Sequence, residues 1–163
     1  MEENKDADYY LEKLKSRGLN RDNYNYSRIS STSKINVFPD EKVFMNWLIA
    51  GDYGDLRSAS GMLFSVYSNP SSEGDLIINK YIKEENMQKK VSDLLDKCTE
   101  TELYLLSVLT KLKKYDVDEL INIHEKTFNE LEKIRDEINS IVSDSLEYFR
   151  KKEKEDKKNP YIG

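Results

Sequence analysis

The longest regular pattern in the chain is an amphipathic helical one near its C-terminal end. From Asp116 to Lys158 no Gly or Pro interrupts the sequence, and apolar residues recur mostly at steps of three and four. These apolar positions are Val117, Leu120, Ile121, Phe128, Leu131, Ile134, Ile138, Ile141, Val142, Leu146 and Phe149. The spacing predicts one long helix with a single buried face.

Both ends of this stretch carry helix boundary signals. Asp116 is a candidate N-cap, with Glu119 three residues later as its capping partner, and Asn159 with Pro160 would stop the helix. Roughly 41 helical residues would span about 60 Å, whereas a compact chain of this length is only about 40 Å across. The helix is therefore expected either to project and pair with a partner, or to break at Ser143-Asp144-Ser145.

Shorter helices are predicted upstream of the long one. Gly51 and Gly54 would frame a tight turn between two of them, and Thr99 with Glu102 would form the capping box of another. The expected ranges are 6–17, 40–50, 55–68, 74–97 and 99–114. The predicted fold class is all-α, a helical bundle with a long, coiled-coil-like C-terminal helix.

Residues 19–38 show no sustained period and are rich in Asn, Ser and Tyr. They predict a polar, partly irregular arm, with plain disorder as the alternative. If the arm is ordered, Tyr24 and Tyr26 need a surface to pack on. The expected organisation is an N-terminal helix and arm at 1–38, a helical bundle at 39–149 and a charged, solvated tail at 150–163.

Composition narrows the class of protein. The net charge is -5, charged residues make up 35% of the chain, and there are only 6 Gly and 3 Pro, which suits helices. No apolar run approaches the ~18 residues that a membrane span needs. Cys98 is the only cysteine, so no disulfide can form within the chain. We expect an acidic cytoplasmic protein without a large basic domain for nucleic acid.

The sequence contains few candidates for catalytic or metal-binding residues. His124 is the sole histidine and lies on the apolar stripe, and Ile121 stands where an E-x-x-H metal motif would need Glu. His124 is therefore expected to be a core or interface residue. Cys98 has no recognisable base beside it, as nucleophilic catalysis requires. The sequence predicts no catalytic residue, no metal site and no cofactor, and hence no enzyme.

The first functional hypothesis is a non-enzymatic protein-binding or assembly factor. Its type would be a phage- or plasmid-type regulator or inhibitor that acts by protein contact. The partner is unknown, and self-association into a homo-oligomer through the long helix is expected. A partner would cover parts of the apolar stripe that the bundle leaves open. The candidate contacts are Tyr24, Tyr26, Ile141, Tyr148 and Phe149.

The alternative hypothesis is an oligomeric DNA-binding protein, such as a small repressor, a partition factor or a terminase small subunit. The helices at 40–50 and 55–68 would then form a helix-turn-helix, although Arg57 is the one cation at the start of the second helix. Arg150, Lys151 and Lys152 near the end of the long helix would add phosphate contacts.

Overall fold

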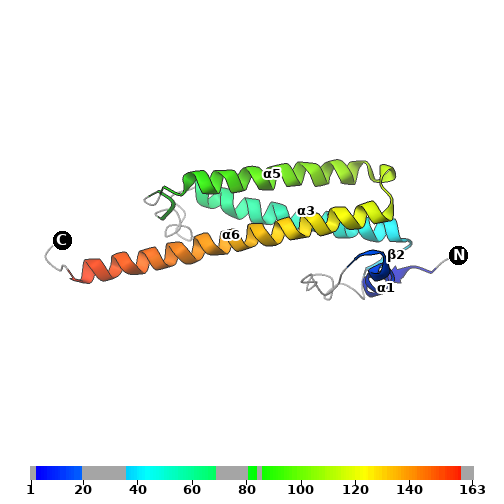
Figure 1. Ribbon diagram of the computed structural model, residues 1–163, viewed down its shortest axis with the longest axis horizontal. Helices are drawn as coiled ribbons and strands as arrows, with labels where there is room; N and C mark the ends of the chain where they lie inside the picture. Colours follow the sequence, from blue (N-terminus) through cyan, green and yellow to red (C-terminus); the bar gives the residue numbers. More distant parts are fainter. Residues whose placement is uncertain (1–2, 20–35, 69–80, 84–85, 159–163) are drawn as a thin grey trace. The chain divides into compact units, whose positions relative to one another are not determined.

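The protein is an all-α helical bundle with a long C-terminal helix, as the sequence predicts. The computed structural model describes residues 3–19, 36–68, 81–83 and 86–158 (Figure 1). The long helices in these ranges are α3 (Glu41–Ser68), α5 (Gln88–Thr110) and α6 (Val117–Lys158). Each of them contributes to two compact units, one made of Met1–Asp55 with Thr101–Leu131 and the other of Leu56–Glu100 with Glu132–Gly163.

The first unit begins with a small sheet and a short helix. Strand β1 (Lys5–Asp6) pairs antiparallel with β2 (Val37–Phe38), with Lys5 opposite Phe38. Helix α1 (Ala7–Lys13) starts at an Asp6 cap and continues into the 3-10 turn η1 (Lys15–Arg17). Gly18 ends this turn at a φ of 113°, a left-handed conformation that glycine adopts at low cost.

Capping residues fix where α3 and α6 begin in the first unit. The Asp40 side chain accepts the Val43 N–H at 2.9 Å, and the Asp116 side chain accepts the Glu119 N–H at 2.8 Å. The predicted N-cap at Asp116 is thus confirmed. The buried apolar residues of this unit are Ala7, Tyr10, Leu11, Leu14, Leu19, Phe38, Phe44, Met45, Leu48, Ile49, Leu105, Val108, Leu120, Ile121, Ile123, Phe128 and Leu131.

Helix α3 is continuous, so the predicted tight turn at Gly51–Gly54 is wrong. The helix-turn-helix expected from that turn is wrong as well, because 40–50 and 55–68 belong to one helix. Glycine permits a turn but does not require one, and packing can override its low helix propensity. The buried positions Leu48, Asp52 and Leu56 continue at four-residue steps straight through the glycines.

Helix α5 spans the boundary that was predicted between two helices. It runs from Gln88 to Thr110, so the boundary expected at Thr99 is wrong. The Thr99 hydroxyl donates to the Leu95 carbonyl at 3.0 Å, which satisfies it inside the helix instead of at a cap. Asn86, just before α5, has a φ of 57°. Residues 74–80 of the helix predicted at 74–97 lie outside the described ranges.

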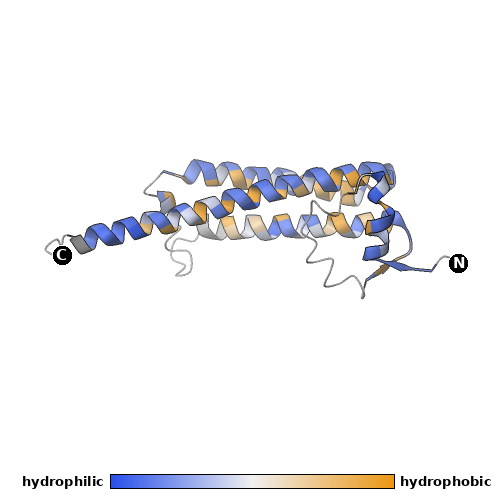
Figure 2. Ribbon diagram, turned by 60° about the horizontal axis from the view of Figure 1, so that its bottom comes forward, coloured by the Kyte–Doolittle hydropathy of each residue, from blue (hydrophilic) through white to orange (hydrophobic). Residues whose placement is uncertain are grey.

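Helix α6 runs without a break from Val117 to Lys158, so of the two alternatives the continuous helix is confirmed. The Ser145 hydroxyl donates to the Val142 carbonyl at 2.7 Å and is thereby satisfied within the helix. Figure 2 shows the alternating hydrophobic and hydrophilic bands along α6. The buried apolar residues of the second unit are Leu56, Leu63, Ile82, Val91, Leu94, Cys98, Ile134, Ile138 and Ile141.

Candidate functional site

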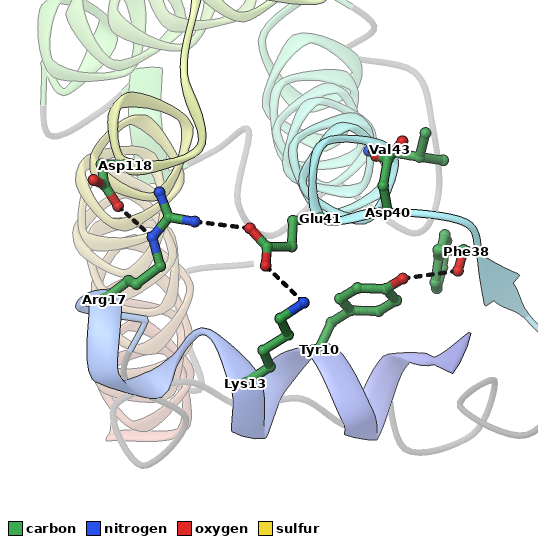
Figure 3. A network of polar contacts seen from close by, with 8 residues as sticks. All are labelled: Tyr10, Lys13, Arg17, Phe38, Asp40, Glu41, Val43 and Asp118. Atoms are coloured by element: carbon green, nitrogen blue, oxygen red, sulfur yellow. Dashed lines mark hydrogen bonds and ion pairs between the residues drawn. The ribbon is translucent and has the colours of Figure 1, made fainter. Parts of the chain in front are cut away.

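A cluster of ion pairs joins the N-terminal segment to the first turns of α3 and α6 (Figure 3). Arg17 donates to Glu41 at 2.7 Å and to Asp118 at 2.8 Å, and the Lys13 ammonium lies 2.9 Å from Glu41. Hydrogen bonds to these carboxylates raise the pKa of Lys13 and the pKa of Arg17. All partners are at least partly exposed, so the cluster anchors the segment without excluding water.

An open hollow of about 600 Å³ adjoins this cluster. Tyr9 lines it, and the ammonium groups of Lys5 and Lys13 lie 5.6 and 5.8 Å from the centroid of the Tyr9 ring. The charged residues that line the hollow are Glu3, Lys5, Lys13, Asp40, Glu41 and Lys42. Cations and anions balance, so the hollow has no net charge with which to select an ionic ligand.

A deeply buried polar contact joins α3 and α6 in the first unit. His124 Nδ1 lies 2.5 Å from Asp52 Oδ2, and the two side chains are 0% and 1% exposed. The His124 ring also approaches the Phe128 ring, with 6.2 Å between centroids. The prediction of a core histidine is confirmed. A solute cannot reach a pair buried this deeply, so we interpret it as an interhelical contact and not as a reaction centre.

Sequence reasoning missed Asp52 as the partner of His124. It assigned Gly51-Asp52-Tyr53-Gly54 to a turn between two helices, whereas Asp52 occupies a buried position of a continuous helix. A signal was present, because Asp52 lies four residues after Leu48 and four before Leu56. A buried polar group needs a hydrogen-bond partner. An acidic residue on one apolar stripe and a lone histidine on another can therefore be expected to pair.

The described residues offer little for metal chemistry. No three His, Cys, Asp or Glu side chains in the described ranges are grouped so that they could hold a metal ion. Cys98 is a fully buried thiol. None of the described helices combines the length and the apolar character that crossing a membrane would require.

An exposed apolar strip lies on α6 in the second unit. It consists of Val142, Leu146 and Phe149, which share one side of the helix at steps of four and three, and we call it the α6 edge. Val142 is partly buried, while Leu146 and Phe149 are 43% and 39% exposed. Upstream along α6, Ile134, Ile138 and Ile141 are all buried. Apolar side chains thus continue along α6 past Ile141, the last of its apolar residues that the rest of the chain buries.

A shallow hollow of about 430 Å³ lies beside the α6 edge. The residues that line it all come from α6 and are Ser143, Leu146, Glu147, Arg150, Lys151 and Lys154. Except for Leu146 they are polar or charged, and all of them are exposed. The α6 edge therefore combines apolar contact area with charges of both signs.

The predicted contact residues on α6 differ in how much of each side chain is exposed. Ile141 is 2% exposed and belongs to the core of the second unit. Tyr148 is partly buried against Tyr81, with 5.6 Å between ring centroids, and the Lys152 ammonium lies 5.4 Å from the Tyr148 ring. Phe149 is exposed. Leu146, which was not among the predicted contacts, stands beside it as the more exposed of the two.

The remaining predicted site residues fall into two groups. Tyr24 and Tyr26 lie outside the described residues. Of the cations proposed for nucleic acid, Arg57 is exposed on α3, and Arg150, Lys151 and Lys152 are exposed on α6.

A second exposed apolar set, not predicted from the sequence, lies on α5. Its members Leu103, Tyr104 and Leu106 are 63%, 51% and 43% exposed. At 100° per residue they spread over nearly half of the helix circumference, so they do not form a strip. No charged residue stands between them in the sequence. This set therefore indicates less about a partner than the α6 edge does.

Comparison of the chain with protein-family models, with curated proteins and with solved structures finds no match.

Proposed function

We propose that the protein is a non-enzymatic protein-binding or assembly factor and that the α6 edge is its contact surface. The observation that carries this proposal is the exposure of Leu146 and Phe149 at the end of an apolar stripe that is buried from Leu120 to Ile141. Large apolar side chains that stand together in water favour burial by another surface, at about 25 cal/mol for each Å² covered.

The spacing of the α6 edge suits a helical contact. Val142, Leu146 and Phe149 repeat at i, i+4 and i+7, the anchor pattern of a helix that docks along another helix or in a groove. Phe149 and Arg150 also belong to residue types that are enriched in protein interfaces. Such a protein would act by contact alone, as expected of a phage- or plasmid-type regulator.

The test is the size of the assembly that contains the tagged chain in an extract of its source cells. We expect the wild type to elute from a size-exclusion column well ahead of the 19.1 kDa chain. Leu146→Asp/Phe149→Asp should elute at the size of the chain alone, because two carboxylates would have to be buried in the contact.

The matched control is Asn122→Asp/Asn129→Asp, which adds two carboxylates at exposed positions of the same helix away from the α6 edge. It should elute like the wild type. Elution of the wild type at the size of a single chain, or an unchanged elution of Leu146→Asp/Phe149→Asp, would contradict the proposal.

The exposure of Arg150, Lys151 and Lys152 favours nucleic-acid binding as a second candidate function. Each phosphate contact makes the affinity more dependent on salt. The slope of the logarithm of the binding constant against the logarithm of the salt concentration is therefore proportional to the number of these contacts. If the protein binds DNA, Arg150→Ala/Lys151→Ala should lower the affinity and reduce that slope by about two. The absence of saturable DNA binding at low salt would rule this function out.

A further inference from the structure

We draw no further inference here: the strongest candidate, the open hollow in the first unit that Lys5, Tyr9 and Lys13 line, carries none because the cations and anions among the described residues around it balance, so that nothing in the structure shows which ligand it would take.

Discussion

At the residue scale, the buried contact between Asp52 and His124 leads to a prediction about stability. Both side chains are buried, and they come from α3 and α6, residues 72 apart in the chain. A polar pair inside an apolar core can form in one relative placement of the two helices only. We infer that the pair fixes the register of α3 against α6 in the first unit, as buried polar residues do in some coiled coils.

Removal of either partner should destabilise the protein strongly. Asp52→Ala or His124→Ala leaves the other polar group in an apolar core, so we expect each to lower the free energy of unfolding by about 3 kcal/mol. The double variant should cost less than the sum of the two, because it leaves neither group behind. Urea unfolding followed by circular dichroism measures all three values.

Thr127→Val is the control, because Thr127 is also buried on α6 but its hydroxyl donates to the Ile123 carbonyl of its own helix at 2.8 Å. It should change stability by less than about 1 kcal/mol. Strict additivity of the Asp52 and His124 substitutions would show that the two side chains do not interact.

Lys13 gives a prediction at alkaline pH. Its hydrogen bond to Glu41 raises the pKa of Lys13 above the ordinary value of 10.5. The folded state therefore binds the proton more tightly, so the stabilisation is full below pH 10.5 and is lost as the pH rises through the folded-state pKa. The difference in melting temperature between the wild type and Lys13→Met should shrink above pH 10.5. A difference that grows with pH would contradict the contact.

Some of these residue roles could be predicted from the sequence. The period of the stripe placed His124 in the core, and the structure confirms it. Its partner could not be predicted with the same rules, because Asp52 lies between two glycines that are typical of a turn. Local propensity was misleading there, since the packing of Leu48 and Leu56 holds the segment in a helix.

At the element scale, the continuity of α3 can be tested with glycine substitutions. A Cβ at Gly54 would meet no atom within 4 Å, so Gly54→Ala should stabilise a continuous helix by about 0.5–1 kcal/mol. Gly18 is equally uncrowded but has a φ of 113°, so Gly18→Ala should destabilise the protein by about 1–2 kcal/mol. Thermal unfolding of the two variants and the wild type measures both changes in stability. A loss of stability in Gly54→Ala would indicate a turn at that position.

The helix boundaries predicted from the sequence are correct where the capping side chain accepts a backbone N–H group at the helix start. They are wrong where a residue that could cap a helix does not do so. Asp116 and Asp40 accept backbone N–H groups and begin α6 and α3. Thr99 has the same capping chemistry, yet its hydroxyl bonds within α5. A residue that can form a cap can also bond inside a helix, and which of these occurs depends on the neighbouring helices.

At the scale of the whole molecule, the sequence predicted the bundle and its long last helix but not which part of the stripe the chain covers itself. Ile141 and Phe149 belong to the same stripe, yet Ile141 is 2% exposed and Phe149 is 39% exposed. Burial depends on where the other helices pack against α6, and the period of one helix does not contain this information. Leu146 was missed as a contact for the same reason.

The central claim is that another polypeptide covers the α6 edge, and photo-crosslinking tests it most directly. Benzoylphenylalanine is placed at Leu146 in one chain and at Asn129, an exposed position of the same helix, in another. Each chain is irradiated both purified and in an extract of the source cells. We predict a protein adduct at position 146, of a second copy or of another chain, and none at position 129. The absence of any adduct at position 146 in both preparations would contradict the claim.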